Sequence, residues 1–422
     1  MNTTKKRLSV LICVVLIIQM FTVNVASAAY VNGAYISSSG ACVMDYETGE
    51  VLYQYYGYTP RVPASMTKLL NVYCVYDAIS KGEITMDTVV PISANVYSKS
   101  RNGKYQNVVP LNYGTAYTVS QLLDIVISYS ASGASVALAE LVGGGSEYRF
   151  VARMNSTAKA MGVSANFYDS CGYANNTITP VGMATIARNL IKDYPDVLTR
   201  SSRAYVTFYG TTYKSTNYLL DTYYYEGADG LKTGTGSVAG ACFCGTAARN
   251  GHRLITVTMG SSSTNQRFID TIRLLDYGFA QLEAREGIFY TDAKTYINGY
   301  EVPTFMYKGE TSHAVVIAED LRSYGFDVDF NGETECININ YNPEKAYTPI
   351  PLESYKNRDG QRVCSVLESN ITATATNDTS VVALEDIYII NGYTCISVDE
   401  LSKVYGFTWN DAEKAAYITA DN

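Results

Sequence analysis

The sequence predicts an α/β domain, built as an antiparallel sheet flanked by helices, followed by a smaller α+β module made of repeats. Strand-like and helix-like segments are mixed over residues 35–283, and successive strand-like segments there are joined by short turns, which favours antiparallel pairing. Beyond about residue 296, two stretches of similar sequence indicate an internal repeat. With 422 residues, 47% of them hydrophobic, the chain can form two or three domains with separate cores.

The first 28 residues have the pattern of a secretory signal peptide. A basic stretch at positions 5–7 precedes an apolar run over positions 8–23, and small residues at positions 26–28 form a cleavage site. We therefore expect cleavage near Ala28 and export of the remaining chain. An uncleaved membrane anchor is the alternative, although the apolar run is short for one.

Turn signals and helix-end signals define the first elements of the domain. Residues 41–56 contain two strand-like runs around a Glu-Thr-Gly turn. A helix is expected over residues 65–80, because a proline precedes its start and a Lys-Gly pair closes it. Two further helices are expected over residues 119–129 and 134–142, with a polar break between them.

The second half of the domain is expected to complete the sheet. Strands are predicted over residues 227–236, 239–249 and 252–260, separated by a glycine-rich turn and an Asn-Gly hairpin turn. A helix over residues 267–282 follows them. We place the domain at residues 29–285.

Composition excludes several classes of function. The formal net charge of −8 argues against a nucleic-acid partner, because phosphates demand a basic surface. The two histidines, His252 and His313, have no metal-ligating neighbour three or four residues further along, and the cysteines after residue 28 form no Cys-x-x-Cys pair. We expect neither a metal site nor a cofactor.

The histidines also limit the nucleophilic chemistry that is open to the chain. His252 directly follows the Asn-Gly hairpin turn, a position that is usually exposed, and no Gly-x-Ser-x-Gly motif occurs. A catalytic serine would therefore need a lysine as its base.

Ser65 and Lys68 form a Ser-x-x-Lys motif at the start of the helix expected over residues 65–80. Residues three apart on a helix share a face, so the hydroxyl and the amine can share a hydrogen bond. Mostly apolar residues follow Lys68, which predicts a buried amine with a lowered pKa that can accept a proton. The helix N-terminus would stabilise an oxyanion at Ser65. For this motif alone, a helix-capping serine beside a lysine that reaches solvent is the alternative.

Two further segments could complete such a site. Lys232-Thr233-Gly234 occurs once, on an expected strand that could pair with an extended peptide while the lysine and the threonine contact a carboxylate. Ser130 and Ser132 lie in the polar break between two expected helices, where a hydroxyl could pass a proton to a leaving amine.

Together, the three segments resemble the motifs of the D-alanyl-D-alanine carboxypeptidases, the low-molecular-mass penicillin-binding proteins. Ser65-Met-Thr-Lys68, the Ser130 break followed by Ala-Ser-Val-Ala-Leu-Ala-Glu, and Asp-Gly-Leu-Lys-Thr-Gly occur in that order. The resemblance implies a β-lactamase/transpeptidase-like fold and a serine peptidase that removes the terminal D-alanine from peptidoglycan stem peptides. It also implies acylation by β-lactams and, with the signal peptide, a secreted or wall-associated protein.

The resemblance implies a role for each motif residue. Ser65 would be the nucleophile, Lys68 its base, and Ser130 the proton donor to the departing D-alanine. The backbone NH groups of Ser65 and Thr235 would form the oxyanion hole. Arg267 would lie near the site of the substrate carboxylate, with a surface arginine as the alternative. The residues expected to contact the substrate are Ser132, Lys232, Thr233, Gly234, Thr235 and Arg267.

One position departs from the family pattern. The second motif of the family is Ser-x-Asn, and Ser132 stands where the asparagine belongs. A hydroxyl makes fewer hydrogen bonds than an amide. Losing one costs about 1 to 3 kcal/mol, or roughly a tenfold to hundredfold slowdown if the bond acts in the transition state. A catalytically weak or inactive wall-binding pseudoenzyme therefore stays open; a β-lactamase is less favoured, because no Glu-x-x-Leu-Asn pattern follows the second motif.

The C-terminal module, expected over residues 286–422, contains two repeats at about 293–342 and 381–420. Tyr-Gly-Phe at residues 324–326 matches Tyr-Gly-Phe at residues 405–407. The repeats resemble the copper-amine-oxidase-like N-terminal, or stalk, modules of secreted bacterial proteins, without copper ligands. The resemblance implies that the module has a cell-wall or surface partner.

Overall fold

The computed structural model describes residues 30–31, 34–285, 287–309, 312–356, 358, 360, 362–364, 371–376, 381–390 and 393–420. The predicted signal peptide and its cleavage site lie outside these residues. The chain divides into two compact units, Met1–Phe279 and Ala280–Asn422, each with its own hydrophobic core. None of the helices in the described ranges has both the length and the apolar character that crossing a membrane requires.

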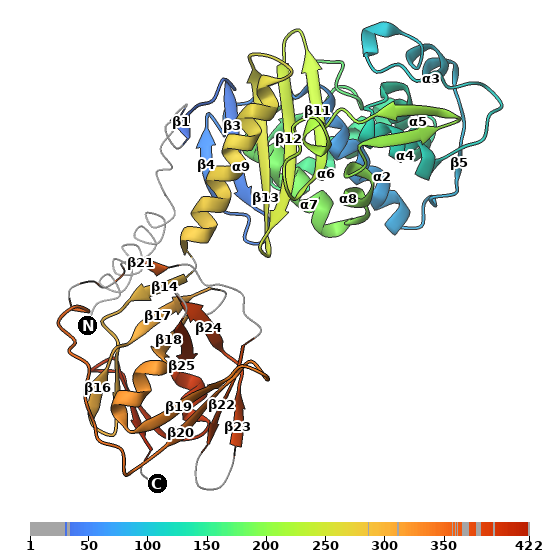
Figure 1. Ribbon diagram of the computed structural model, residues 1–422. Coiled ribbons are helices and arrows are strands. Elements are labelled where there is room, and N and C mark those ends of the chain that lie inside the picture. Colours follow the sequence, from blue (N-terminus) through green and yellow to red (C-terminus); the bar gives the residue numbers. More distant parts are fainter. Residues whose placement is uncertain are drawn as a thin grey trace, which may run out of the picture. The chain divides into compact units, whose positions relative to one another are not determined.

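The first unit is built on a five-stranded sheet in which every neighbouring pair is antiparallel (Figure 1). In spatial order its strands are β11 (Ala228–Gly236), β12 (Gly240–Arg249), β13 (His252–Ser261), β3 (Gly40–Asp45) and β4 (Val51–Tyr55). Short turns join β3 to β4, β11 to β12 and β12 to β13, as the sequence predicts. The pairing of β13 with β3 brings the two ends of the domain together.

Helices cover both faces of this sheet. Cys42 and Met44 of β3 belong to the core that includes residues of α2 and α7, whereas Val43 lies against Gly278 of α9. Alternate residues of a strand point to opposite faces. Because both faces are covered, all six residues of β3 are buried. The predicted antiparallel sheet flanked by helices is therefore confirmed.

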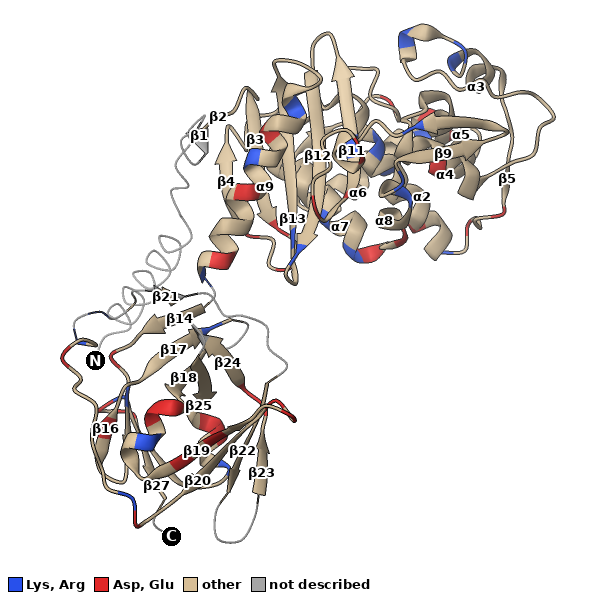
Figure 2. Ribbon diagram, in the orientation of Figure 1, with Lys and Arg blue, Asp and Glu red and all other residues tan. Residues whose placement is uncertain are grey.

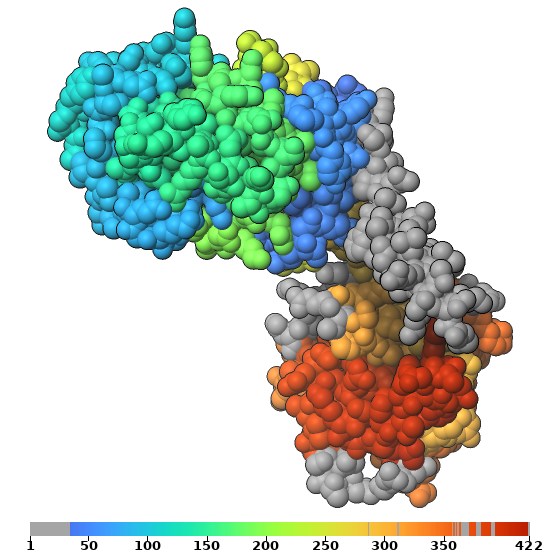
Figure 3. All heavy atoms as spheres, turned by 180° about the vertical axis from the view of Figure 1, so that it is seen from behind, coloured from blue at the N-terminus to red at the C-terminus, as the bar shows by residue number. Residues whose placement is uncertain are grey.

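Most of the helices lie between β4 and β11 in the sequence. The helical elements of this unit are η1 (Ala64–Thr67), α2 (Lys68–Ser80), α3 (Ala94–Lys99), η2 (Gly103–Tyr105), α4 (Val119–Ser128), α5 (Ser132–Val142), α6 (Glu147–Ala160), α7 (Pro180–Asp193), α8 (Asp196–Ser201), η3 (Tyr218–Leu220) and α9 (Gln266–Arg285). Two-stranded pairs join β1 (Tyr30–Val31) to β2 (Ala34–Tyr35), β5 (Val89–Val90) to β6 (Tyr117–Thr118), β7 (Ala165–Asn166) to β8 (Thr177–Ile178), and β9 (Tyr205–Phe208) to β10 (Thr211–Lys214). Figure 3 shows residues of this middle part of the chain forming a continuous surface on the first unit.

Local sequence signals explain where several helices begin. Thr118 and Gln121 form a capping box at the start of α4, and Pro180 is the first residue of α7 behind the capping hydroxyl of Thr179. The helix predicted over residues 65–80 begins instead as the tighter turn η1 before α2, a common arrangement at helix N-termini. Figure 2 shows few charged residues on the strands of the central sheet and both signs along α9.

The second unit consists mainly of strands. One sheet contains β21 (Arg362–Cys364), β14 (Gly287–Tyr290), β17 (Phe305–Lys308), β18 (Ser312–Ile317), β25 (Tyr393–Ser397) and β24 (Ile387–Ile390); a second contains β16 (Tyr300–Val302), β15 (Lys294–Ile297), β27 (Ala415–Thr419) and β26 (Gly406–Asn410); a third contains β19 (Phe326–Asn331), β20 (Cys336–Tyr341), β22 (Thr372–Thr376) and β23 (Val381–Leu384). Two short helices, η4 (Glu319–Tyr324) and α10 (Val398–Ser402), complete the described elements.

The two similar stretches of sequence have similar structures. In the first, the hairpin β17–β18 leads through η4 into the hairpin β19–β20, and in the second, the hairpin β24–β25 leads through α10 into the hairpin β26–β27. Strands β18 and β25 pair with each other, so the two stretches share one sheet. Strand β15 pairs in parallel with β27, which ties the beginning of the unit to its end.

Candidate active site

Two glycines from distant segments fix the turn that carries Ser65. A Cβ atom on Gly234 of β11 would clash with the carbonyl oxygen of Pro63, and a Cβ atom on Gly172 would clash with the carbonyl oxygen of Ala64. Only glycine fits where two backbones approach this closely. The turn η1 is thereby held between β11 and the loop before β8, and the partly exposed Ser65 lines a pocket there.

The Lys68 amine is fully buried among three hydrogen-bond acceptors. Its Nζ atom donates to Ser65 Oγ at 2.8 Å, to Ser132 Oγ at 3.2 Å and to the carbonyl oxygen of Cys171 at 2.6 Å. Burial lowers the pKa of Lys68, and the nearby Cys171 and Asp169 oppose that shift. A lowered pKa enlarges the uncharged fraction of the amine, which is the form that can accept a proton from Ser65.

Ser130 lies in the break between α4 and α5, whereas Ser132 is the first residue of α5 and is the one that bonds to Lys68. The Ser132 hydroxyl accepts from Lys68 Nζ and donates to the carbonyl oxygen of Tyr105 at 3.0 Å. Ser130 is buried and has a left-handed backbone, with a φ angle of 72°. The described residues that line the pocket include Ser132 and not Ser130. The role of Ser130 as a proton donor stays a prediction.

Lys232 on β11 supplies a second buried amine. Its side chain is 2% exposed, and its Nζ atom donates to the carbonyl oxygen of Thr233 at 3.3 Å. Burial, together with the positive charges of Lys68 and Arg267, lowers the pKa of Lys232 well below its usual value. The site therefore contains two amines for which the charged form is disfavoured.

Arg267 supports the end of β11 and is buried, not on the surface. Its Nη1 atom donates to the carbonyl oxygen of Gly234 at 3.1 Å and to Thr235 Oγ1 at 2.9 Å. Burial lowers the pKa of Arg267 to about 10, which leaves the guanidinium charged at neutral pH. On the same strand, Thr233 Oγ1 donates to Thr216 Oγ1 at 2.7 Å.

These elements enclose a pocket of about 160 Å³. Ser65, Ser132 and Thr235 line it, and Tyr105 and Tyr173 add two aromatic rings whose centres lie 4.5 Å apart. The pocket offers hydroxyl groups and a nucleophile to a short polar ligand. Among the described side chains, no group of three His, Cys, Asp or Glu is arranged to hold a metal ion.

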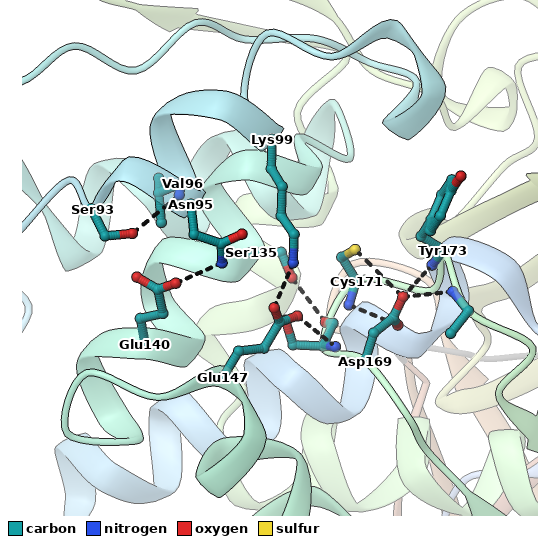
Figure 4. A network of polar contacts seen from close by, with 12 residues as sticks. Ser93, Asn95, Val96, Lys99, Ser135, Glu140, Glu147, Asp169, Cys171 and Tyr173 are labelled. Carbon is teal, nitrogen blue, oxygen red and sulfur yellow. Dashed lines mark hydrogen bonds and ion pairs between the residues drawn. The ribbon is translucent and has the colours of Figure 1, made fainter.

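Asp169 holds the loop that provides the Cys171 carbonyl, and the motif analysis missed it. Its carboxylate accepts four hydrogen bonds from the backbone NH groups of residues 171–174, at 2.6 to 3.3 Å, and one from Asn176 Nδ2 at 3.0 Å. Figure 4 shows this carboxylate directed into the turn formed by Cys171 and Tyr173. An Asp-x-x-Gly pattern signals such a turn, but it gives no information on where the turn packs.

Glu147 connects the same loop to α3 (Figure 4). Its carboxylate accepts hydrogen bonds from the backbone and the hydroxyl of Ser170, at 3.2 and 2.7 Å, and pairs with Lys99 Nζ at 2.6 Å. Lys99 Nζ lies 5.8 Å from the ring centre of Tyr105. The Glu147–Lys99 pair therefore links the loop of Cys171, whose carbonyl accepts from Lys68, to the segment of Tyr105, whose carbonyl accepts from Ser132.

Comparisons with known proteins agree on the family of the first unit. The family model described as D-alanyl-D-alanine carboxypeptidase matches residues 24–263. The D-alanyl-D-alanine carboxypeptidase DacF of Bacillus subtilis is 29% identical over 253 residues, which are 58% of this chain and 63% of the relative. A D-alanyl-D-alanine carboxypeptidase of Streptomyces sp. strain K15 is 30% identical over 276 residues, which are 61% of this chain and 93% of the relative. The chain thus spans less than two thirds of the Bacillus protein.

Solved structures support the same fold. A penicillin-binding protein of Streptococcus pneumoniae, PBP3, described as a peptidoglycan synthesis regulatory factor, matches with a TM-score of 0.55 and 36% identity over 58% of this chain and 77% of its own. Penicillin-binding protein D2 of Listeria monocytogenes, in its ampicillin-bound form, matches with a TM-score of 0.52 and 29% identity over 58% of this chain and 98% of its own. These similarities confirm the predicted β-lactamase/transpeptidase-like fold.

The family match ends before the second unit begins, so the resemblance of the repeats to stalk modules stays a prediction. The match covers more than half of the chain, and it includes the turn that carries Ser65 and the strand that carries Lys232. The chain belongs to the D-alanyl-D-alanine carboxypeptidase family.

Proposed function

We propose that this chain is an exported serine D-Ala-D-Ala carboxypeptidase that removes the terminal D-alanine from peptidoglycan stem peptides. The observation that carries the proposal is the 2.8 Å hydrogen bond between the buried Lys68 amine and Ser65 Oγ at the pocket. Family membership supports it, as do the names of the relatives, which are D-alanyl-D-alanine carboxypeptidases.

Acylation begins with attack of Ser65 Oγ on the carbonyl carbon of the penultimate D-alanine. Lys68 takes the hydroxyl proton as the new C–O bond forms. The backbone NH groups of Ser65 and Thr235 stabilise the negative charge on the carbonyl oxygen, and the close approach of β11 to η1 supports this assignment. The C–N bond then breaks, and we assign to Ser130 the relay of the proton: its hydroxyl donates a proton to the departing D-alanine amine and takes the proton held by Lys68, which leaves Lys68 uncharged again.

Deacylation returns the enzyme to its starting state. A water molecule attacks the ester carbon while the uncharged Lys68 accepts its proton. Lys68 then passes this proton to Ser65 Oγ as the C–O bond to Ser65 breaks, which releases the peptide shortened by one D-alanine. A β-lactam follows the same first step, but its cleaved amide stays part of the acyl group. The acyl-enzyme is therefore expected to be long-lived.

The C-terminal carboxylate of the substrate would lie beside β11. Lys232 and Thr233 belong to that strand, and Arg267 donates a hydrogen bond to the strand at the Gly234 carbonyl. Charge-assisted hydrogen bonds to a carboxylate are roughly twice as strong as neutral ones. This arrangement favours a peptide with a free C-terminus over the middle of a chain.

Covalent labelling with a fluorescent penicillin tests the proposal, together with D-alanine release from a pentapeptide. We expect wild type to be labelled and to release D-alanine, and Ser65→Ala to do neither. Ser156 is the matched control, because it precedes Lys159 with the same spacing on α6 but is exposed; Ser156→Ala should behave as wild type. Label on Ser65→Ala would contradict the assignment of the nucleophile.

A catalytically weak or inactive wall-binding protein is the second candidate, and Ser132 favours it. The only hydrogen of its hydroxyl is donated to the Tyr105 carbonyl, so none remains for a substrate carbonyl while that bond holds. Absence of both label and D-alanine release from wild type would support this candidate. Rapid loss of label would support a β-lactamase.

We also propose that the protein is secreted or wall-associated after cleavage near Ala28, and that its C-terminal module has a cell-wall or surface partner. N-terminal sequencing of the protein recovered outside the cell tests the first part. A protein that keeps residues 1–28 would contradict it.

A further inference from the structure

A pocket of about 380 Å³ in the second unit lies where the hairpin β26–β27 meets β18 and α10. Its volume falls within the range that small-molecule sites occupy, roughly 300 to 1,000 Å³. Figure 3 shows that residues near the end of the chain, coloured red, form much of the surface of this unit in that view. None of the residues that line this pocket belongs to the site of the first unit.

One side of this pocket consists of two exposed aromatic rings. Phe407 and Trp409 are two residues apart on β26, so their side chains lie on the same face, about 7 Å apart along the strand. They are 39% and 44% exposed, and the indole Nε1 atom of Trp409 donates to Asp411 Oδ1 at 2.7 Å. That bond fixes one edge of the indole, while much of the ring surface stays accessible.

Small side chains lie beside these rings. Ala416 is the β27 partner of Trp409 and is 1% exposed, and Ala293 and Ala314 also line the pocket. Methyl groups leave space next to the rings, where larger residues would fill it. The rings and the alanines thus form an apolar surface that is open to a flat ligand.

Polar side chains also line this pocket. His313 Nδ1 lies 3.4 Å from Asp399 Oδ2, and Ser312 adds a hydroxyl group. The His313 ring lies parallel to the ring of Tyr307 within 7°, with the ring centres 6.3 Å apart, and Tyr307 stacks on Tyr388 at 3.9 Å. A carboxylate, an imidazole and a hydroxyl group therefore line the same pocket as the aromatic rings.

We propose that this pocket binds a glycan, a chain of pyranose sugars such as the N-acetylated hexosamines of peptidoglycan. The C–H face of a pyranose ring is apolar and packs on an aromatic ring, while its hydroxyl and acetamido groups bond to a carboxylate and an imidazole. Asp399 disfavours an anionic ligand. A quaternary ammonium ligand is best held by rings that surround it. Phe407 and Trp409 follow one another along one strand and form a flat surface, which does not favour such a ligand.

The choice of sugar rests on the proposed function, because the stem peptides that the first unit would trim are attached to glycan strands. A glycan site on the same chain raises the local concentration of stem peptides near the catalytic serine. This effect needs only that both units belong to one chain.

The fluorescence of Trp409 tests the inference directly, since it is the only tryptophan in the sequence. N-acetylglucosamine oligomers, titrated into the full chain, should produce a saturable change in its emission. We expect Phe407→Ala and Asp399→Asn to weaken the apparent affinity by about tenfold each. Phe330→Ala is the matched control, because Phe330 is 56% exposed in the same unit but outside this pocket; it should leave the affinity unchanged.

Retention on insoluble glycan tests the role of Trp409 itself. The glycan is stripped of its stem peptides, so that the first unit has nothing to bind, and Trp409→Ala should lose retention while releasing D-alanine from a soluble pentapeptide as wild type does. Equal retention of Trp409→Ala and wild type, or emission that responds to choline and not to the oligomers, would overturn the inference. D-alanine release is scored separately, so failure of this inference and failure of the proposed function give different results.

Discussion

Ser132 carries one hydroxyl hydrogen, and the structure directs it to the backbone carbonyl of Tyr105. The hydroxyl oxygen at the same time accepts from Lys68, at 3.2 Å. An asparagine amide has two hydrogens and an acceptor oxygen, so it can bond to the lysine and to a substrate carbonyl together. The residue at this position therefore determines how many contacts the acyl group receives.

We predict that Ser132→Asn raises the rate of D-alanine release. One additional hydrogen bond in the transition state corresponds to about 1 to 3 kcal/mol, or roughly a tenfold to hundredfold increase. Pentapeptide turnover measures the rate, and penicillin labelling checks that Ser65 stays reactive. An unchanged or lower turnover in a folded variant would show that Ser132 does not limit the reaction.

At the level of elements, the position of η1 depends on the close approach of β11. We predict that Gly234→Ala slows acylation of Ser65 at least tenfold, because the new Cβ atom would displace the Pro63 carbonyl and the turn behind it. Gly236→Ala is the control on the same strand, since its Cβ atom would meet Ala64 and Ala239 at an ordinary 3.7 Å. Similar acylation rates for the two variants would contradict this explanation.

The loop around Asp169 acts on the pKa of Lys68 as well as on its position. The uncharged amine takes the proton, so the rate should fall as the pH drops through the lowered pKa of Lys68. The negative charge of Asp169 raises that pKa. Removing this charge must therefore lower the pKa and extend activity toward acidic pH.

We predict that Asp169→Asn moves the acidic limb of the rate–pH profile to lower pH and reduces the maximal rate by about tenfold, because the backbone bonds of the loop weaken. The acylation rate of Ser65, measured from about pH 5 to 9, checks both effects. Asp193→Asn removes a carboxylate that bonds to Tyr73, and it should change neither. A lower rate with an unmoved acidic limb would assign Asp169 a purely structural role.

Parts of the site could be predicted from the sequence because they are local. Ser65 and Lys68 are three residues apart, and their contact follows from the geometry of one turn. The carbonyl of Cys171 could not be predicted, since any residue type offers a carbonyl and the packing of a distant loop decides which one reaches Lys68. Likewise, the sequence could not predict that the Tyr105 carbonyl accepts a hydrogen bond from Ser132.

The fold shows the same difference between local and distant contacts. The hairpins of the central sheet were predictable, because a turn signal separates strands that then pair. The pairing of β13 with β3 joins segments about two hundred residues apart, and no local pattern marks it. In the second unit, the parallel pairing of β15 with β27 joins segments about 120 residues apart, and no local pattern marks it either.

At the scale of the whole molecule, two separate cores predict two unfolding transitions. The core of the first unit contains residues between positions 42 and 259, and that of the second contains residues between 297 and 418. We predict that acylation by a penicillin raises the midpoint of one calorimetric transition and leaves the other unchanged, because the acyl group stabilises only the fold that contains Ser65. Ser65→Ala should show no shift. Equal shifts of both transitions in wild type would contradict independent folding.

The two buried amines make the proton content of the first unit depend on its ligand. The charge of Lys68 is one cause of the lowered pKa of Lys232. A ligand carboxylate beside β11 offsets that repulsion and raises the pKa of Lys232. We predict that binding of an anionic peptide end or a penicillin is accompanied by proton uptake, so that the heat of binding, measured by calorimetry, varies with the ionisation enthalpy of the buffer.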